Sequence, residues 1–316
     1  MNRRLVIASS MSLALVASLA AQAKKPVHAA APTSTAATPS AAASTSTAPA
    51  KDLRFAVLGD FGVDDEREAA VARLIASWEP DFIVTTGDDN YPNGDAATID
   101  QNIGKHFAAF IGHYKGKYGK GSEANRFWPT PGNHDWRGKE ALKPYLDYFT
   151  LPGNGRYYDV LLAEGKVHLF ALDSDKHEPD GIDAASAQAK WAEAGMRASK
   201  ACLKIAAFHH PPYSSSVHGS SMELRWPFAA WGADIVFSGH DHAYERSVAN
   251  GIQYVVTGLG GASTYPFKSV TPESQVRFND DVGAALITLT KGKAVIEFWT
   301  VHGKLVDHVE VPKSCL

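Results

Sequence analysis

Five short segments of the sequence place metal-binding residue types beside glycine or proline. They are Gly59-Asp60-Phe61-Gly62, Gly87-Asp88-Asp89-Asn90-Tyr91, Gly132-Asn133-His134-Asp135, His209-His210-Pro211-Pro212-Tyr213 and Gly239-His240-Asp241-His242. Glycine and proline let the backbone turn sharply off a strand. The carboxylates, imidazoles, amide carbonyl and phenol suit iron, manganese or zinc rather than calcium. One bridging Asp would hold two such ions about 3.5–4 Å apart, as in two-metal hydrolases.

The first predicted elements form a parallel β-α-β unit. Residues 53–59 and 81–86 are apolar runs typical of buried strands. Residues 65–78 carry apolar side chains at helical spacing and acidic residues in the first turn. Such a unit has a right-handed crossover. Further strands are predicted at 166–172, 203–208, 235–238 and 253–257, helices at 184–201 and 222–231, and antiparallel strands within 284–311.

The polar residues of the five segments follow these strands. Asp60, Asp88 and His209 each come directly after a predicted strand, and His240 comes two residues after another. An Asp in such a place is by itself often only a helix cap or a turn residue. The carboxyl ends of the strands of an α/β sheet, however, line one crevice where sites are built. Four strand ends that carry ligand types therefore predict one metal site.

The five segments resemble the signature of the metallophosphoesterases, and Tyr91 narrows the resemblance to the purple acid phosphatases. The stretch His242-Ala243-Tyr244-Glu245-Arg246-Ser247 is similar to the plant-type members, and Gly258-Leu259-Gly260-Gly261 resembles the glycine-rich loop that follows in them. The compact length, without a preceding β-sandwich domain, is more similar to the small mammalian-type, tartrate-resistant members. The resemblance implies an α/β fold, an αββα sandwich of two mixed sheets flanked by helices.

The resemblance also implies a role for each site residue. A trivalent iron would be bound by Asp60, Asp88, Tyr91 and His242. Asp88 would bridge it to a divalent ion, Fe, Zn or Mn, whose other ligands would be Asn133, His209 and His240. The remaining catalytic candidates are His134 as the phosphate contact, Asp135 as the acidic residue that follows it in the family pattern, and His218 as the general acid, nine residues after His209.

These roles imply a secreted acid phosphatase that hydrolyses phosphate monoesters of small molecules. Two cations would neutralise phosphate oxygens and lower the pKa of a bound water, so that metal-activated hydroxide attacks phosphorus below neutral pH. Two alternatives stay open. The first is a phosphodiesterase or nucleotidase with a two-metal Mn, Zn or Fe site on the same scaffold. The second, a metal-binding protein without catalysis, is disfavoured by Asn133, His134 and His218, because a storage site needs no phosphate contact or acid.

Several of these residues also have a structural interpretation. His210 adjoins His209, and family spacing favours His209 because the ligand lies one residue before the X-Pro step. His218 lies in a Ser- and Gly-rich loop that is typical of a solvated segment, and Tyr91 has the alternative of a buried structural aromatic residue. Four further aromatic residues are expected either to wall the pocket or to pack in the core, namely Phe61, Trp136, Tyr213 and Tyr244.

The N-terminal residues are typical of a targeting segment. Arg3 and Arg4 precede the short apolar run 5–20, and Ala21-Gln22-Ala23 fits a cleavage site. Residues 1–23 are therefore predicted to be a signal peptide, because the run is too short for a membrane span. This predicts a secreted or periplasmic protein with no membrane partner after processing. The paired arginines leave Sec and twin-arginine export both open.

The rest of the chain divides into a linker and a domain. Residues 24–50 are mostly Ala, Thr, Ser and Pro, which predicts a disordered linker, and residues 51–316 have the length of one catalytic α/β domain. The net charge is −3 and no basic block appears, which argues against nucleic acid as a partner. The two cysteines, Cys202 and Cys315, exclude a disulfide framework. Export would permit one bridge between them, and two unpaired thiols are the alternative.

Overall fold

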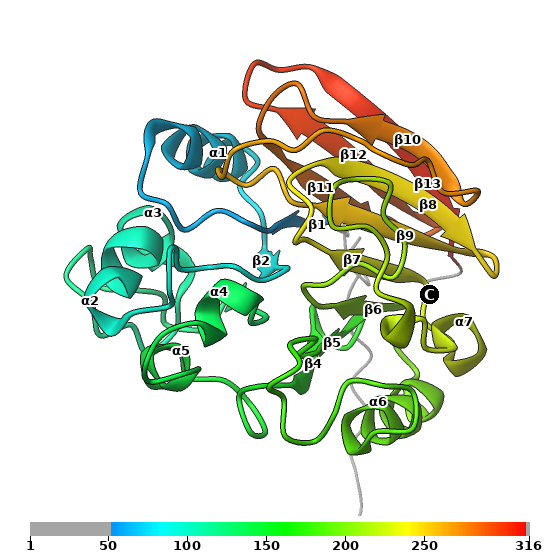
Figure 1. Cartoon of the computed structure of the whole chain (residues 1–316), viewed down its shortest axis with the longest axis horizontal. Helices are drawn as coiled ribbons and strands as arrows, with labels where there is room; N and C mark the ends of the chain where they lie inside the picture. Colours follow the sequence, from blue (N-terminus) through cyan, green and yellow to red (C-terminus); the bar gives the residue numbers. More distant parts are fainter. Residues whose placement is uncertain (1–51, 314–316) are drawn as a thin grey trace, which may run out of the picture. The chain divides into compact units, whose positions relative to one another are not determined.

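Two mixed β-sheets form the centre of the computed structural model, which describes residues 52–313 (Figure 1). One sheet contains six strands in the order β13 (Leu305–Pro312), β12 (Lys293–Thr300), β11 (Gly283–Leu289), β1 (Leu53–Leu58), β2 (Phe82–Thr85) and β3 (Phe127–Trp128). The other contains seven in the order β10 (Ser274–Phe278), β8 (Tyr244–Ala249), β9 (Ile252–Thr257), β7 (Ile235–Ser238), β6 (Leu203–Ala207), β5 (Val167–Ala171) and β4 (Tyr158–Leu162). Strands β1, β2 and β3 are parallel, as are β5, β6, β7 and β9, and the outer strands are antiparallel.

The helices lie on the outer faces of the two sheets. They are α1 (Glu66–Ser77), α2 (Ala96–Ile99), α3 (Lys105–Phe107), α4 (Asn133–Trp136), α5 (Lys143–Tyr148), α6 (Ala187–Ala198) and α7 (Phe228–Trp231). Three short helical segments accompany them, the π-helical η1 (Asp100–Gly104) and the 3-10 helical η2 (Ala108–Phe110) and η3 (Met222–Leu224). Helices α1 to α5 accompany the first sheet, and α6 and α7 cover the second (Figure 1).

Strand alternation explains this layering. In β1, Phe55 and Val57 point into a core shared with Ile205 of β6 and other residues of the second sheet. The intervening residues Ala56 and Leu58 point the other way, into a core that contains apolar residues of α1. Successive side chains of a strand face opposite sides, so a strand buried on both faces reads as a continuous apolar run. The predicted αββα sandwich is confirmed.

Most of the predicted elements are present in the structure, and the prediction of one helix is wrong. Helix α1 begins after Asp65, whose carboxylate accepts the N–H groups of Arg67 and Glu68, as expected for an N-cap. The helix predicted at 222–231 is instead two short pieces, η3 and α7, because Pro227 interrupts it. Strands β3, β4, β8 and β10 were not predicted. They are short or carry alternating polar residues.

The predicted signal peptide, residues 1–23, and linker, residues 24–50, lie outside the described residues. Cys202 is disulfide-bonded, and Cys315, the other cysteine of the sequence, lies outside the described residues. Within residues 52–313, no helix has the length and apolar character needed to cross a membrane.

Candidate metal centre

Three of the predicted ligands sit in the left-handed backbone region just after a strand. Asp60 follows β1 with φ 58°, Asp88 follows β2 with φ 53°, and His240 follows β7 with φ 69°. Residues other than glycine rarely adopt this region, and strained backbone clusters at functional sites. Gly87 has φ 87°, and a Cβ there would lie 2.7 Å from His209 Nδ1. A side chain at position 87 would therefore displace a predicted ligand.

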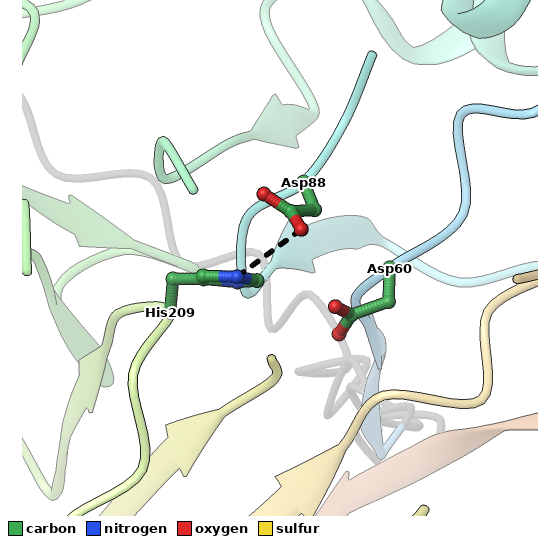
Figure 2. Close-up of side chains that lie close together, drawn as sticks. All are labelled: Asp60, Asp88 and His209. Carbon is green, nitrogen blue, oxygen red and sulfur yellow. Dashed lines mark ion pairs between the residues drawn. The ribbon is translucent and has the colours of Figure 1, made fainter. Parts of the chain in front are cut away.

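The strand ends bring Asp60, Asp88 and His209 together from three strands of two sheets. Figure 2 shows the three side chains pointing toward one another. Their ligand atoms all lie within 4.8 Å of one another, and all three residues are buried. The Nε2 atom of His209 is 3.3 Å from Oδ2 of Asp88. These residues form a donor cluster that could hold a metal ion.

Tyr91 and His242 extend this cluster on the side of Asp60. The Tyr91 hydroxyl is 3.1 Å from Asp88 Oδ2 and 3.4 Å from Asp60 Oδ1. It also lies 3.1 Å from His242 Nε2. The Nδ1–H of His242 donates to the carbonyl of Ser263 at 2.6 Å, because a carbonyl only accepts. That hydrogen bond fixes the tautomer and leaves Nε2 facing the cluster.

Asn133 and His240 extend the cluster on the other side, next to His209. The Nδ1–H of His209 donates to the carbonyl of Thr86 at 2.8 Å, which directs Nε2 toward the cluster. That Nε2 lies 3.1 Å from Asn133 Oδ1 and 3.2 Å from His240 Nδ1. The structure therefore brings all seven predicted ligands into one connected group, with the Asp88 carboxylate between its two halves.

The electrostatics of the group favour cations. Burial lowers the pKa of His209, but the carboxylates of Asp88 and Asp60 outweigh it and raise this pKa to about 10. Burial acts to raise the pKa of Asp88, and the neighbouring His209 and His134 nevertheless hold it below its usual range. Burial, followed by the charges of Asp88 and Asp60, raises the pKa of the Tyr91 phenol well above its usual value. A phenolate at this position therefore requires a nearby cation, and the donor set fits a two-metal centre.

The two neighbours of Asn133 in the chain have different surroundings. The half-buried ring of His134 packs against Tyr91 with ring centroids 4.3 Å apart, and its Nε2 is 3.9 Å from Asp88 Oδ2. Asp135 is buried, and its carboxylate accepts the backbone N–H groups of Asp89, Asn90 and Gly132. The geometry of Asp135 thus favours a positioning role over the predicted catalytic one, because its oxygens are used in joining two ligand-bearing loops.

His218 is exposed, and its ring lies beside that of His240. Its ring centroid is 4.3 Å from that of His240, and its backbone N–H donates to Asp241 Oδ1 at 3.0 Å. Asp241 is buried and also accepts a hydrogen bond from Ser214. The loop that carries His218 is therefore tied to the segment that carries His240.

The structure also places His210 and the four aromatic residues that the sequence suggested for the pocket. The ring of His210 lies 5.0 Å from that of His209 at an angle of 82°, and its Nδ1 is directed to Ser174 Oγ at 2.9 Å, so this nitrogen does not face the group. Of the four aromatic residues expected at the pocket, only Trp136 lines a cavity beside Asn133. The others are core residues: Phe61 and Tyr213 lie in apolar clusters, and Tyr244 packs on Phe298.

Sequence reasoning missed the groups that orient the ligands. Two of them are the backbone carbonyls of Thr86 and Ser263, which leave no side-chain signature. A third is Tyr265, whose ring stacks on His242 with centroids 4.0 Å apart and whose N–H donates to the His242 carbonyl at 2.9 Å. Tyr265 follows the glycine-rich segment 258–261, and this adjacency is the one signal that could have indicated it.

The fold and donor set define a metal-dependent phosphoesterase, and comparison with known proteins agrees. Residues 53–244 match the family model described as Calcineurin-like phosphoesterase, and the chain belongs to this family. It is 26% identical over 300 residues to Purple acid phosphatase 4 of Arabidopsis thaliana, covering 84% of this chain and 85% of that protein. It is 25% identical over 231 residues to Fe(3+)-Zn(2+) purple acid phosphatase 12 of the same plant, covering 67% and 48%.

Among solved structures, a purple acid phosphatase from yellow lupin (Lupinus luteus) seeds matches with a TM-score of 0.63 and 17% identity. The match covers 83% of this chain and 54% of that chain. At this identity the match supports the fold alone. The resemblance to the purple acid phosphatases is confirmed by the relatives found by sequence.

Proposed function

We propose that this protein is an acid phosphatase that hydrolyses phosphate monoesters of small molecules at a dinuclear Fe(III)–M(II) centre, where M is Fe, Zn or Mn. The observation that carries the proposal is the position of Asp88 Oδ2, 3.1 Å from the Tyr91 hydroxyl and 3.3 Å from His209 Nε2. One carboxylate oxygen that faces both halves of the donor group is suited to bridge two ions.

The two halves would hold different ions. Tyr91, Asp60 and His242 include a hard phenolate donor beside Asp88, which suits a trivalent ion. Asn133, His209 and His240 offer an amide oxygen and two imidazoles, which suit a divalent ion. A relative named Fe(3+)-Zn(2+) purple acid phosphatase 12 supports this pairing.

The chain's own residues would bind the substrate and supply a proton. When bound, the two ions supply positive charge to the phosphate oxygens and acidify water at the centre. The Nδ1–H of His134 donates to the Pro92 carbonyl at 2.6 Å, which leaves Nε2 to contact a phosphate oxygen. His218, exposed to solvent, would protonate the leaving alkoxide, a role worth about 10²–10⁴-fold in rate.

The test compares an aryl phosphate monoester with the matching diester across pH, using the metal-loaded protein. We expect the monoester to be cleaved far faster, with an optimum on the acid side of neutral. A clear preference for the diester would instead favour a phosphodiesterase on the same scaffold. Metal binding without turnover of either ester would favour the non-catalytic alternative.

Export is a further part of the proposal. The charged start, apolar run and cleavage site of residues 1–23 support removal of a signal peptide and a mature chain that begins near Lys24. N-terminal sequencing of the protein from the secreted or periplasmic fraction tests this. An intact Met1 on a cytosolic protein would contradict it.

A further inference from the structure

The segment 263–272 connects two parts of the chain that carry candidate residues of the centre. On one side, the Tyr265 N–H donates to the His242 carbonyl at 2.9 Å. On the other, the Lys268 N–H donates to the Ser215 carbonyl at 2.8 Å, in the loop that carries His218. Further hydrogen bonds to that loop run from Ser269 N–H and Thr271 N–H to Ser215, from Lys268 Nζ to the Val217 carbonyl, and from Ser216 Oγ to the Pro266 carbonyl.

The ring of Tyr265 makes the same connection as its backbone. It stacks on the imidazole of His242, with centroids 4.0 Å apart and an angle of 8° between the planes. It lies edge-on to the imidazole of His218, at 5.5 Å and 68°. Tyr265 is half-buried, whereas His242 is buried. One phenol ring therefore packs against two imidazoles that have different roles in the proposed reaction.

The stack restricts a motion of His242 that its hydrogen bond leaves open. The bond from Nδ1–H to the Ser263 carbonyl fixes one atom of the ring, but the ring can still tilt about that atom. The lone pair of Nε2 lies in the plane of the imidazole, so a tilt would turn it away from the donor group. The parallel ring of Tyr265 opposes this tilt, and it acts as an outer partner that orients a ligand.

The ring of His218 has fewer restraints. Its backbone N–H donates to Asp241, but its imidazole has no hydrogen-bond partner among the described residues. The rings packed against it are those of His240, at 4.3 Å and 32°, and Tyr265. A proton donor must stay within hydrogen-bond reach of the atom that it protonates. Loss of the Tyr265 ring would remove one of the two rings that keep the imidazole in place.

We propose, building on the phosphatase function above, that Tyr265 is a positioning residue whose ring aligns the metal ligand His242 and the proton donor His218 together. Tyr265 acts through these two histidines and not on the substrate itself. Both contacts are made by the ring, so the role should survive in Tyr265→Phe and be lost in Tyr265→Leu.

The first measurement concerns His242 and needs no substrate. The full chain is loaded with iron and zinc, and the release of iron to an added chelator is timed. Tyr265→Leu should release iron roughly tenfold faster or more, because loss of an outer partner lowers metal affinity by about 10–100-fold. Tyr265→Phe should release iron at nearly the wild-type rate.

The second measurement concerns His218. The leaving group of para-nitrophenyl phosphate departs without a proton, whereas the alkoxide of ethyl phosphate needs one. The ratio of kcat/KM for the nitrophenyl ester to that for the ethyl ester should rise roughly tenfold in Tyr265→Leu, a part of the about 10²–10⁴-fold that a general acid contributes. Tyr265→Phe should keep nearly the wild-type ratio. In a His218→Ala background, Tyr265→Leu should no longer change the ratio, because the proton donor is already absent.

Tyr157→Leu is a matched control for the loss of a tyrosine ring. Tyr157 is also half-buried, its ring packs on that of Trp191 at 5.0 Å, and its hydroxyl donates to Asp180. Neither partner belongs to the donor group, so this variant should change neither measurement. Tyr265→Met serves as a second variant without a ring, and a thermal transition shows that each variant is folded.

Three results would overturn the proposal. If folded Tyr265→Leu and Tyr265→Met change neither iron release nor the ratio, or only one of them, Tyr265 does not align the two histidines, and the phosphatase function stands. If the ratio changes equally with and without His218, the effect does not pass through His218. If the metal-loaded wild type cleaves neither ester, the proposed function fails, and the role of Tyr265 toward His218 fails with it.

Discussion

At the scale of single residues, the centre depends on side chains held by a second set of groups. His209 and His242 each donate Nδ1–H to a backbone carbonyl, so both present Nε2 to the donor group. Such outer partners fix the tautomer and orientation of a ligand. Asp88 is the most consequential position, because one of its carboxylate oxygens lies 3.1 Å from the Tyr91 hydroxyl and 3.3 Å from His209 Nε2, the two ligand atoms that face each other across the group.

Replacing the shared carboxylate should have a larger effect than replacing a ligand of one half. Asp88→Ala should lose both metals and with them the activity. Asn133→Ala should mainly lower the metal affinity of the divalent site, by roughly 10–100-fold or more. Removal of a residue that only orients a ligand already lowers metal affinity by a factor in this range. Elemental analysis of both variants measures this, with the exposed Asp147→Ala as a control that keeps both metals. Two metals retained in Asp88→Ala would refute the shared role.

At the scale of elements, the strands place the ligands and the loops complete the site. The strands that precede Asp60, Asp88, His209 and His240 were predictable because strands buried on both faces read as apolar runs. The glycines beside the ligands marked the turns. The prediction of a single helix at 222–231 was wrong, because it followed the apolar periodicity of the segment and gave too little weight to the break at Pro227. The contacts of Ser263, Tyr265 and Asp241 could not be predicted, because they depend on how distant loops fold back on the strand ends.

Helix α1 contains a buried acid, Glu68, that is not part of the metal centre. Glu68 accepts the backbone N–H groups of Val63 and Asp64 through Oε2, at 3.0 and 2.6 Å. Its Oε1 is buried without a partner among the described residues. Burial raises its pKa from 4.5 to about 9. The folded protein therefore holds this proton across a pH range in which the unfolded chain releases it.

This shift in pKa predicts that Glu68→Gln increases the stability of the protein at high pH. The folded-state pKa lies above the unfolded value, so wild-type stability falls as pH rises from about 4.5 to about 9, by up to about 1.4 kcal/mol per pH unit. Because Gln carries no titratable proton, the variant does not lose this stability as the pH rises. Thermal unfolding should show the variant equal to wild type near pH 5 and more stable at pH 8.

The control for this prediction lies on the same helix. Glu66 is highly exposed, so Glu66→Gln should change the free energy of unfolding little at either pH. A Glu68→Gln variant with the same pH dependence as wild type would show that Glu68 does not titrate with the raised pKa.

At the scale of the whole molecule, the fold assembles the proposed iron site from segments far apart in the chain. Asp60 follows β1 in one sheet, Tyr91 follows β2, and His242 precedes β8 in the other sheet. Their contacts exist only when both sheets are packed together. A signal from a metal bound by these three residues would therefore report on the complete tertiary structure.

The visible spectrum of the iron-loaded protein tests the central claim most directly. A Tyr91 phenolate bound to Fe(III) should give a broad charge-transfer band, so the wild type should be coloured. Tyr91→Phe removes the hydroxyl with little change in volume, so the variant should keep a folded thermal transition and lose the band. A colourless, active wild type that contains zinc or manganese at both positions would contradict the Fe(III)–phenolate centre.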